Sequence, residues 1–93
     1  MVSQAAKDED IKKWKYMVKR PLDTEFEQKH DDKICIEYRN ECRRCEMHDL
    51  GLYAHNCCKE FYKWLVHTRN KNVRWAQYWA QKMLDRIKAV EVK

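Results

Sequence analysis

Glycine and proline are nearly absent from this sequence, which contains one of each among 93 residues. Tight β-hairpin turns and phosphate-binding loops both rely on glycine, so the shortage argues against a β-rich fold and against a nucleotide-binding loop. Long hydrophobic runs are also missing. No run exceeds three residues, as in Trp64-Leu65-Val66, whereas a membrane-spanning helix requires about 20 apolar residues. With 44% hydrophobic and 38% charged residues, the composition predicts a small all-α protein.

Acidic residues become scarce towards the C-terminal end, and this scarcity produces the net charge of +5. Residues 61–93 contain eight Lys and Arg but only two Asp and Glu, and they also carry Trp64, Trp75 and Trp79. A segment that is both basic and aromatic predicts an anionic or amphipathic partner, such as lipid headgroups, an acidic protein surface or nucleic acid. A solvated basic face over an ordinary core is the alternative.

Apolar spacing and capping residues predict four helices. Pro21 ends the first helix, and Thr24 followed by Glu27 is a capping-box pattern that begins the second. Gly51 separates the second from the third, because glycine accepts the left-handed backbone that ends many helices. The predicted ranges are about 8–19, 25–48, 53–69 and 73–92.

These helices predict a single domain over residues 1–93. The central part, 23–70, is expected to be a helical hairpin linked by cysteines, with 25–48 and 53–69 as its two rods. Residues 1–22 and 71–93 are expected to be amphipathic helical arms that extend from the hairpin.

The last predicted helix is amphipathic, with apolar residues at helical spacing from Ala76 to Val90. The earlier helices offer little surface to cover it, so an external partner is expected for Trp75 and Trp79. Core burial is the alternative, and it suits Trp79 better than Trp75. Exposed Trp and Arg commonly anchor interfaces, and the predicted interface residues are Trp14, Trp64, Arg74, Trp75, Trp79 and Arg86.

Five cysteines lie inside the predicted hairpin, at positions 35, 42, 45, 57 and 58. Gly51 is midway between Cys45 and Cys57, so a chain that folds back at Gly51 places these two residues opposite each other. The same register pairs Tyr38 with Trp64, which agrees with the apolar stripe. A disulfide closing this loop would contribute roughly 3 kcal/mol in the chain-entropy model.

The remaining cysteines allow more than one connectivity. Cys42 with Cys58 is the expected second bond, and Cys35 with Cys58 is the alternative. Because the number of cysteines is odd, at least one thiol stays free or bonds to a neighbouring molecule. Burial as a small apolar side chain suits Cys35 but not the other cysteines.

A zinc site is a further interpretation of the sulfur atoms. Zinc sites with Cys-x2-Cys spacing occupy loops or knuckles, whereas the pattern here is helical, so no metal is expected. A redox pair at Cys42 and Cys45 would lack the usual strand-to-helix context. The residues that could supply zinc ligands are Cys42, Cys45, His48, His55, Cys57 and Cys58.

Paired cysteines indicate an oxidising compartment. The first ten residues, however, contain three acids and no apolar segment, unlike a secretory signal or an Arg-rich transit peptide. The mitochondrial intermembrane space reconciles these observations, since small helical proteins with paired cysteines enter it without a cleaved presequence. The common twin Cys-x9-Cys pattern fails, because Cys35 and Cys45 match one pair but His67 and Thr68 stand where the second would end.

The stretch from Cys45 to Glu60 has a Cys-x11-Cys pair across a glycine-containing turn and ends in Tyr53-Ala54-His55-Asn56-Cys57-Cys58-Lys59-Glu60. It resembles the PDSW-type accessory subunit of mitochondrial NADH:ubiquinone oxidoreductase (complex I). Gly51 lies one residue later than in that family, Cys58 is an addition, and the chain is shorter than animal members. The resemblance covers about 16 residues and implies a structural disulfide between Cys45 and Cys57.

The resemblance further implies a non-catalytic subunit, peripheral on the inner membrane at the intermembrane-space side of the complex I membrane arm. Other membrane-arm subunits would be its partners, with no cofactor or small-molecule substrate. The four histidines are scattered, and no Ser-His-acid set or paired carboxylate in a credible pocket is present.

Three other functions compete with this one. The first is an assembly factor of the same compartment. The second is a last helix that lies on an anionic membrane surface, with Trp75 and Trp79 at headgroup depth. The third is a nucleic-acid-binding module, which is disfavoured because Asp85 and Glu91 interrupt its basic residues: Lys71, Arg74, Lys82, Arg86 and Lys88.

Overall fold

A computed structural model describes residues 3–30, 32–33, 59–90 and 92. All five cysteines lie outside these residues, as does the part of the predicted hairpin from 34 to 58. The predicted disulfides and the fold-back at Gly51 therefore lie outside the described residues as well.

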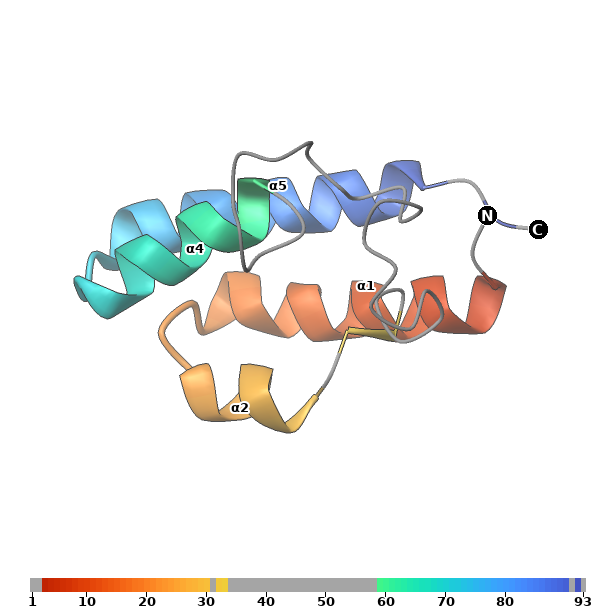
Figure 1. The fold of residues 1–93 in the computed structure, drawn as a ribbon, viewed down its shortest axis with the longest axis horizontal. Coiled ribbons are helices and arrows are strands. Elements are labelled where there is room, and N and C mark those ends of the chain that lie inside the picture. The colour runs from red at the N-terminus through yellow and green to blue at the C-terminus, as the bar shows by residue number, and fades with distance from the viewer. Residues whose placement is uncertain (1–2, 31, 34–58, 91, 93) are drawn as a thin grey trace.

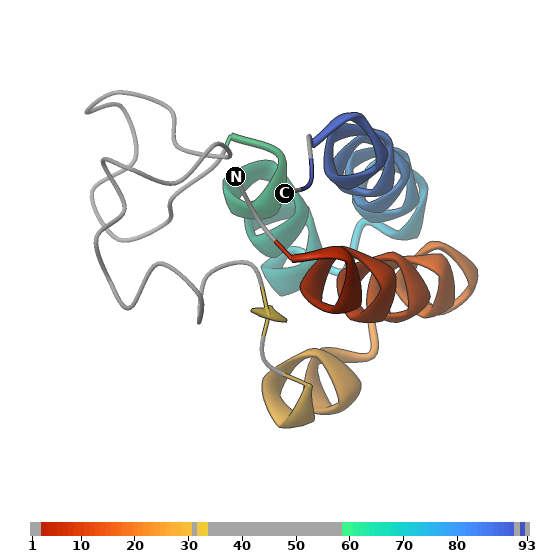
Figure 2. The same ribbon diagram turned by 90° about the vertical axis from the view of Figure 1, so that its right-hand side faces the viewer.

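The described residues form four helices, which confirms the all-α class (Figure 1). Viewed along their length, α1, α4 and α5 surround one core, and α2 lies against the outer side of α1 (Figure 2). The helices are α1 (Gln4–Lys19), α2 (Thr24–Lys29), α4 (Lys59–Arg69) and α5 (Val73–Ala89).

Helix α1 begins four residues before the predicted start, because Ser3 caps it. The Ser3 hydroxyl accepts a hydrogen bond from the Ala6 backbone N–H at 3.2 Å, as N-cap serines do. Its end was predicted correctly: Lys19 is the last helical residue, and Pro21 follows in the turn.

The start and the length of the second predicted helix were wrong. Asp23, not Thr24, is the N-cap of α2, and its carboxylate accepts the Phe26 backbone N–H at 3.0 Å. The helix ends at Lys29, because the backbone of His30 leaves the helical region (φ −120°, ψ 87°). The His30 imidazole Nδ1 lies 2.9 Å from the Phe26 carbonyl oxygen, so the side chain caps this end.

The α4–α5 turn depends on a residue with left-handed backbone. Lys71 has φ 54°, and its N–H donates to the Thr68 carbonyl at 3.0 Å. The next N–H, of Asn72, donates to the His67 carbonyl at 2.9 Å. These two bonds form a Schellman motif that ends α4. Asn72 then caps α5 through its side chain, which accepts the Trp75 N–H, so a single residue serves both helices.

The first and last helices are not extended arms. They pack against each other in antiparallel orientation, with Lys7 Nζ 2.8 Å from the Val90 carbonyl at one end of the pair and Gln77 Nε2 2.8 Å from the Val18 carbonyl at the other. Helix α5 also packs along α4, and it ends at Ala89 rather than near Val92. The apolar stripe of α5 is therefore covered by the chain's own helices, which were expected to offer little surface to it.

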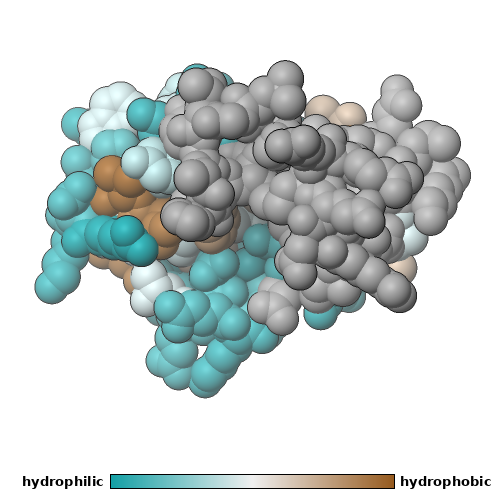
Figure 3. All heavy atoms as spheres, in the orientation of Figure 1, coloured by the Kyte–Doolittle hydropathy of each residue, from teal (hydrophilic) through white to brown (hydrophobic). Residues whose placement is uncertain are grey.

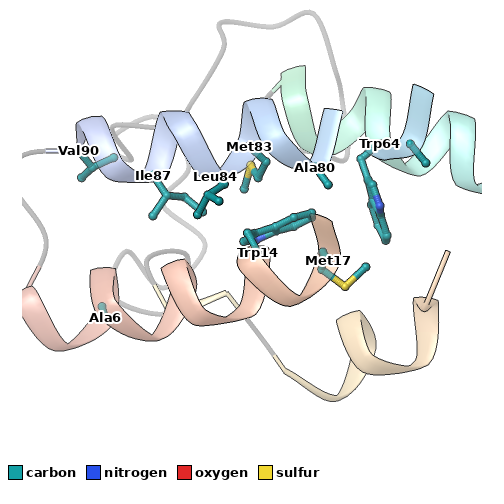
Figure 4. Packing of buried hydrophobic residues seen from close by; sticks show 10 residues of the cluster. Ala6, Trp14, Met17, Trp64, Ala80, Met83, Leu84, Ile87 and Val90 are labelled. Carbon is teal, nitrogen blue, oxygen red and sulfur yellow. The ribbon is translucent and has the colours of Figure 1, made fainter. Parts of the chain in front are cut away.

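The core is built on two tryptophans. The rings of Trp14 and Trp64 meet edge to face, with centroids 5.5 Å apart at 90°, and both are 0% exposed. Trp14 points from α1 towards Ala80 and Met83, while Trp64 reaches from α4 towards Met17 (Figure 4). Ala76 and Ala80 are fully buried, and small side chains at these positions let neighbouring helices approach α5 closely.

Candidate interaction surface

The six predicted interface residues separate into three groups by burial. Trp14 and Trp64 are fully buried, so their rings hold the core together and are not offered to a partner in this structure. Arg74 and Trp75 are exposed on α5, and Trp75 keeps 48% of its surface accessible. The other two residues, Trp79 and Arg86, are half-buried on the same helix.

Three aromatic side chains form a continuous row on α5. The ring centroids of Trp75 and Tyr78 are 5.4 Å apart, and those of Tyr78 and Trp79 are 5.2 Å apart, both edge to face. His67 of α4 stacks on Trp75 at 5.9 Å. Because each ring supports its neighbour, the row is assembled before any partner arrives, which lowers the entropy cost of binding.

Helical spacing explains why this row faces outwards. Positions 75, 78, 79 and 82 recur at three- and four-residue intervals and share one face of α5. The core stripe, which includes Ala76, Ala80 and Met83, lies on another face of the same helix. Val73 and Tyr78, with 51% and 45% of their surfaces accessible, extend the apolar exposure around Trp75.

Two lysines lie over the rings. Lys82 Nζ is 5.3 Å from the Tyr78 ring centroid, and Lys59 Nζ is 5.8 Å from that of Trp79. Both are within the range of a cation–π contact. These residues together form what we call the aromatic–basic surface: Lys59, His67, Trp75, Tyr78, Trp79 and Lys82.

An ion pair fixes α4 beside this surface. Arg86 Nη1 lies 2.8 Å and 3.0 Å from the two carboxylate oxygens of Glu60, and both side chains are largely shielded from solvent. Glu60 is the second residue of α4 and directly follows Lys59, so the ion pair holds Lys59 near Trp79. Arg86 therefore links the two helices through a neutralised pair and is not a free interface cation.

A buried polar network joins α1 to α2 and to residues 32–33. The Lys13 ammonium lies 3.1 Å from Asp32 Oδ1 and 3.4 Å from Glu27 Oε1, with only 4% of its side chain exposed. The same Asp32 oxygen accepts the Trp14 indole N–H at 3.0 Å. Asp10, which is also buried, accepts the Lys33 backbone N–H at 2.7 Å. The network thus pairs the buried charges and fixes the position of Trp14.

A cavity of about 350 Å³ opens beside this network. Several of its charged side chains are already paired: Lys12 lies 3.9 Å from Glu9, and Lys29 lies 2.8 Å from Glu25. These pairs neutralise much of the basic lining, so the cavity makes a weaker ligand site than the aromatic–basic surface. It is lined by Glu9, Asp10, Lys12, Lys13, Phe26, Lys29, His30 and Lys33.

One hydrogen bond shifts two ionisation equilibria at the α1–α2 turn. The Tyr16 hydroxyl donates to Asp23 Oδ2 at 2.6 Å. This bond, with the Phe26 backbone N–H, lowers the pKa of Asp23 below its ordinary value. The same bond raises the pKa of Tyr16, because ionised tyrosine would face a carboxylate. The Tyr16–Asp23 hydrogen bond stabilises the turn between α1 and α2, because Asp23 is also the N-cap of α2.

Within residues 3–30, 32–33, 59–90 and 92, no group of three His, Cys, Asp or Glu side chains could hold a metal ion. The cysteine and histidine set that could form a zinc site lies outside the described residues. None of the described helices is long and apolar enough to cross a membrane.

Tyr78, His67 and Lys59 belong to the aromatic–basic surface but were not predicted from the sequence. Tyr78 could have been found, because it follows Trp75 by three residues and so shares its helix face. His67 and Lys59 belong to α4, and only the packing of α4 against α5 brings them to the row.

The chain was compared with protein-family models, with curated proteins and with solved structures, and none of the three comparisons gives a match.

Proposed function

We propose that this protein is a non-catalytic structural subunit that attaches to a larger assembly through the aromatic–basic surface. The observation that carries the proposal is the row of exposed Trp75, exposed Tyr78 and half-buried Trp79, which is ordered before binding and flanked by lysines. Burying Trp and Tyr rings that are already ordered contributes large area at low entropy cost, which is typical of interface hot spots.

The proposed host is mitochondrial complex I, with the protein on the intermembrane-space side of the membrane arm. This part of the proposal rests on the resemblance of residues 45–60 to PDSW-type accessory subunits, including the disulfide expected between Cys45 and Cys57. A small all-α domain is compatible with a supporting role. Its contribution would be to the assembly and stability of the complex and not to electron transfer.

Native gel electrophoresis of mitochondria from cells that express a tagged chain tests this proposal. A permanent subunit should migrate with the NADH dehydrogenase activity of a very large complex. The double variant Trp75→Ala/Tyr78→Ala should fold normally but migrate mainly as free protein. If the wild-type chain never migrates with that activity, complex I is not the host.

An assembly factor of the same compartment is the alternative, and the same gel distinguishes it. A factor should be found on intermediates or free, and it should be absent from the mature complex. Peptide mapping without reduction tests the cysteine part of the proposal, since it reports directly whether Cys45 and Cys57 are bonded. Replacement of Cys45 by serine should then lower the amount of protein and of assembled complex.

A further inference from the structure

We infer that the aromatic–basic surface binds the headgroup region of an anionic lipid bilayer. The inference rests on the proposed function, because it names the partner of the same surface. It would hold the protein at the membrane beside the assembly that it supports.

The charge around the surface is predominantly positive, although Asp85, three residues after Lys82, is an exposed carboxylate that accepts a hydrogen bond from Gln81. Residues 61–84 contain no Asp or Glu, and their cations include exposed side chains around the row: Arg69, Lys71, Arg74 and Lys82. Protein interfaces generally use charges of both signs to fix the register between partners. A lipid surface is laterally uniform and requires no register, so cations alone suffice, each contributing attraction to anionic headgroups.

The identity of the exposed rings also favours a headgroup region. Trp and Tyr combine an apolar ring with a polar edge and concentrate at membrane–water interfaces for that reason. Among the described residues, neither the Trp75 indole N–H nor the Tyr78 hydroxyl has a hydrogen-bond partner. Both groups are therefore available to phosphate and carbonyl oxygens of lipid headgroups.

The position of the surface suits a planar partner. Val73 and Trp75, both about half exposed, lie directly after the turn that joins α4 to α5. This turn forms one end of the antiparallel pair in the ribbon view (Figure 1). Helix α2, on the lower side of the fold in this orientation, presents mainly hydrophilic side chains (Figure 3). The molecule thus has one end that can approach a membrane and another face suited to water.

Nucleic acid suits the same surface less well. Bases bind single-strand proteins by stacking on open aromatic faces. Here His67 is stacked on Trp75, and the ammonium groups of Lys82 and Lys59 lie over Tyr78 and Trp79. The ring faces are partly occupied, whereas the Trp75 indole N–H and the Tyr78 hydroxyl form no hydrogen bond with the described residues.

Co-sedimentation of the purified full chain with lipid vesicles tests the inference. We expect binding to vesicles of equal parts phosphatidylcholine and phosphatidylglycerol, and little binding to phosphatidylcholine alone. Trp75→Ala/Tyr78→Ala should weaken partitioning by at least about tenfold, because two half-exposed aromatic rings no longer enter the interface. Unchanged thermal melting of the variant would show that its fold is intact.

A matched pair of charge variants separates local attraction from net charge. Arg74→Gln/Lys82→Gln should reduce partitioning by roughly fivefold for each charge removed. Lys12→Gln/Lys29→Gln removes the same total charge from the α1–α2 side, where each lysine is ion-paired, and should change partitioning little. Equal effects of the two pairs would overturn the inference.

The vesicle and gel experiments fail in different ways. Absence of binding to anionic vesicles would overturn the lipid inference. If Trp75→Ala/Tyr78→Ala still lost its place in the large complex, the surface would instead contact a protein subunit, and the proposed function would stand. If the chain binds anionic vesicles strongly but never joins the complex, the lipid inference would stand and the proposed function would fail. Tighter binding to a single-stranded oligonucleotide than to anionic vesicles would also overturn the inference.

Discussion

The Trp64 indole N–H donates to the carbonyl oxygen of Pro21 at 2.9 Å, and this bond joins α4 to the turn after α1. The same carbonyl accepts the Thr68 hydroxyl at 3.4 Å. Both donors belong to the buried face of α4. The turn that ends the first helix is therefore held by residues more than forty positions away in the chain.

Replacement of Trp64 by phenylalanine should lower the free energy of unfolding by about 2 kcal/mol. The variant loses a buried hydrogen bond and leaves part of the indole volume empty. Trp64→Ala should cost about 3–5 kcal/mol, because the whole ring contact with Trp14 disappears. Chemical denaturation measures both values. A matched change at exposed Trp75 should cost less than about 0.5 kcal/mol, and a similar cost at both positions would contradict the buried role of Trp64.

Glycine at position 71 should stabilise the protein. Lys71 occupies the C′ position of the Schellman motif with φ 54°, where a side chain with a Cβ atom is unfavourable. We expect Lys71→Gly to raise the free energy of unfolding by about 0.5–1 kcal/mol, after the greater entropy of the unfolded glycine chain is subtracted.

Arg69→Gly is the control for that substitution, since it also removes one positive charge but lies at the last position of α4. Glycine in a helix should destabilise the protein by up to about 1 kcal/mol. The two variants should therefore shift the melting temperature in opposite directions. A decrease for both would show that the left-handed backbone at Lys71 is not a source of strain.

Loss of the Lys13 ammonium should be costly. Lys13→Ala leaves Glu27 and Asp32 without their shared cation in a poorly solvated site, and we expect a loss of about 3 kcal/mol. Lys12→Ala, one position earlier, removes an exposed ion pair with Glu9 and should change stability by less than about 0.5 kcal/mol. Equal effects in urea denaturation would refute the distinction between these neighbouring lysines.

The Asp23 carboxyl should titrate below its ordinary pKa, and Tyr16→Phe should move that pKa back upwards, because the Tyr16 hydroxyl is the main group that lowers it. Carboxyl carbon chemical shifts followed during an acid titration measure both changes. Because the pKa is lowered in the folded protein, Asp23 contributes its full stabilisation above the pKa that the carboxyl has in the unfolded chain. This stabilisation is lost as the pH falls through the lower pKa of the folded protein.

The sign is reversed for Tyr16, whose pKa is raised by the same bond. Its contribution is complete below the ordinary tyrosine pKa and is lost as the pH rises through the raised folded value. The pair should therefore support the α1–α2 turn across the neutral range and weaken it only at acid and alkaline extremes. An Asp23 pKa that does not respond to Tyr16→Phe would contradict this assignment.

Local signals predicted some helix ends and missed others for identifiable reasons. Pro21 predicted the end of α1 because proline cannot continue a helix. The Thr24 and Glu27 pattern gave the wrong cap, because Asp23, one residue earlier, is an equally good cap and also receives the Tyr16 hydroxyl. The predicted end of one helix at residue 69 and start of the next at 73 are confirmed, but without a glycine in this turn no residue type predicted the left-handed backbone of Lys71.

The candidate surface was predicted only in part. Trp75 and Arg74 were expected to be exposed, and they are. Trp14 looked the same as Trp75 in the sequence, since each lies on an amphipathic helix beside basic residues. Trp14 is buried and Trp75 is exposed. The reason is that α4 and α5 cover the face of α1 that carries Trp14, whereas the face of α5 that carries Trp75 stays open.

The sequence by itself determined the helical class, the basic and aromatic character of residues 61–93 and the approximate positions of α1 and α5. These properties follow from composition and from periodicity within one helix, which do not depend on distant residues. Only the tertiary structure decided which tryptophans are buried, which lysines are paired and that α1 and α5 pack together. Those outcomes depend on contacts between segments far apart in the chain, such as Trp64 with Pro21, and no local pattern specifies such contacts.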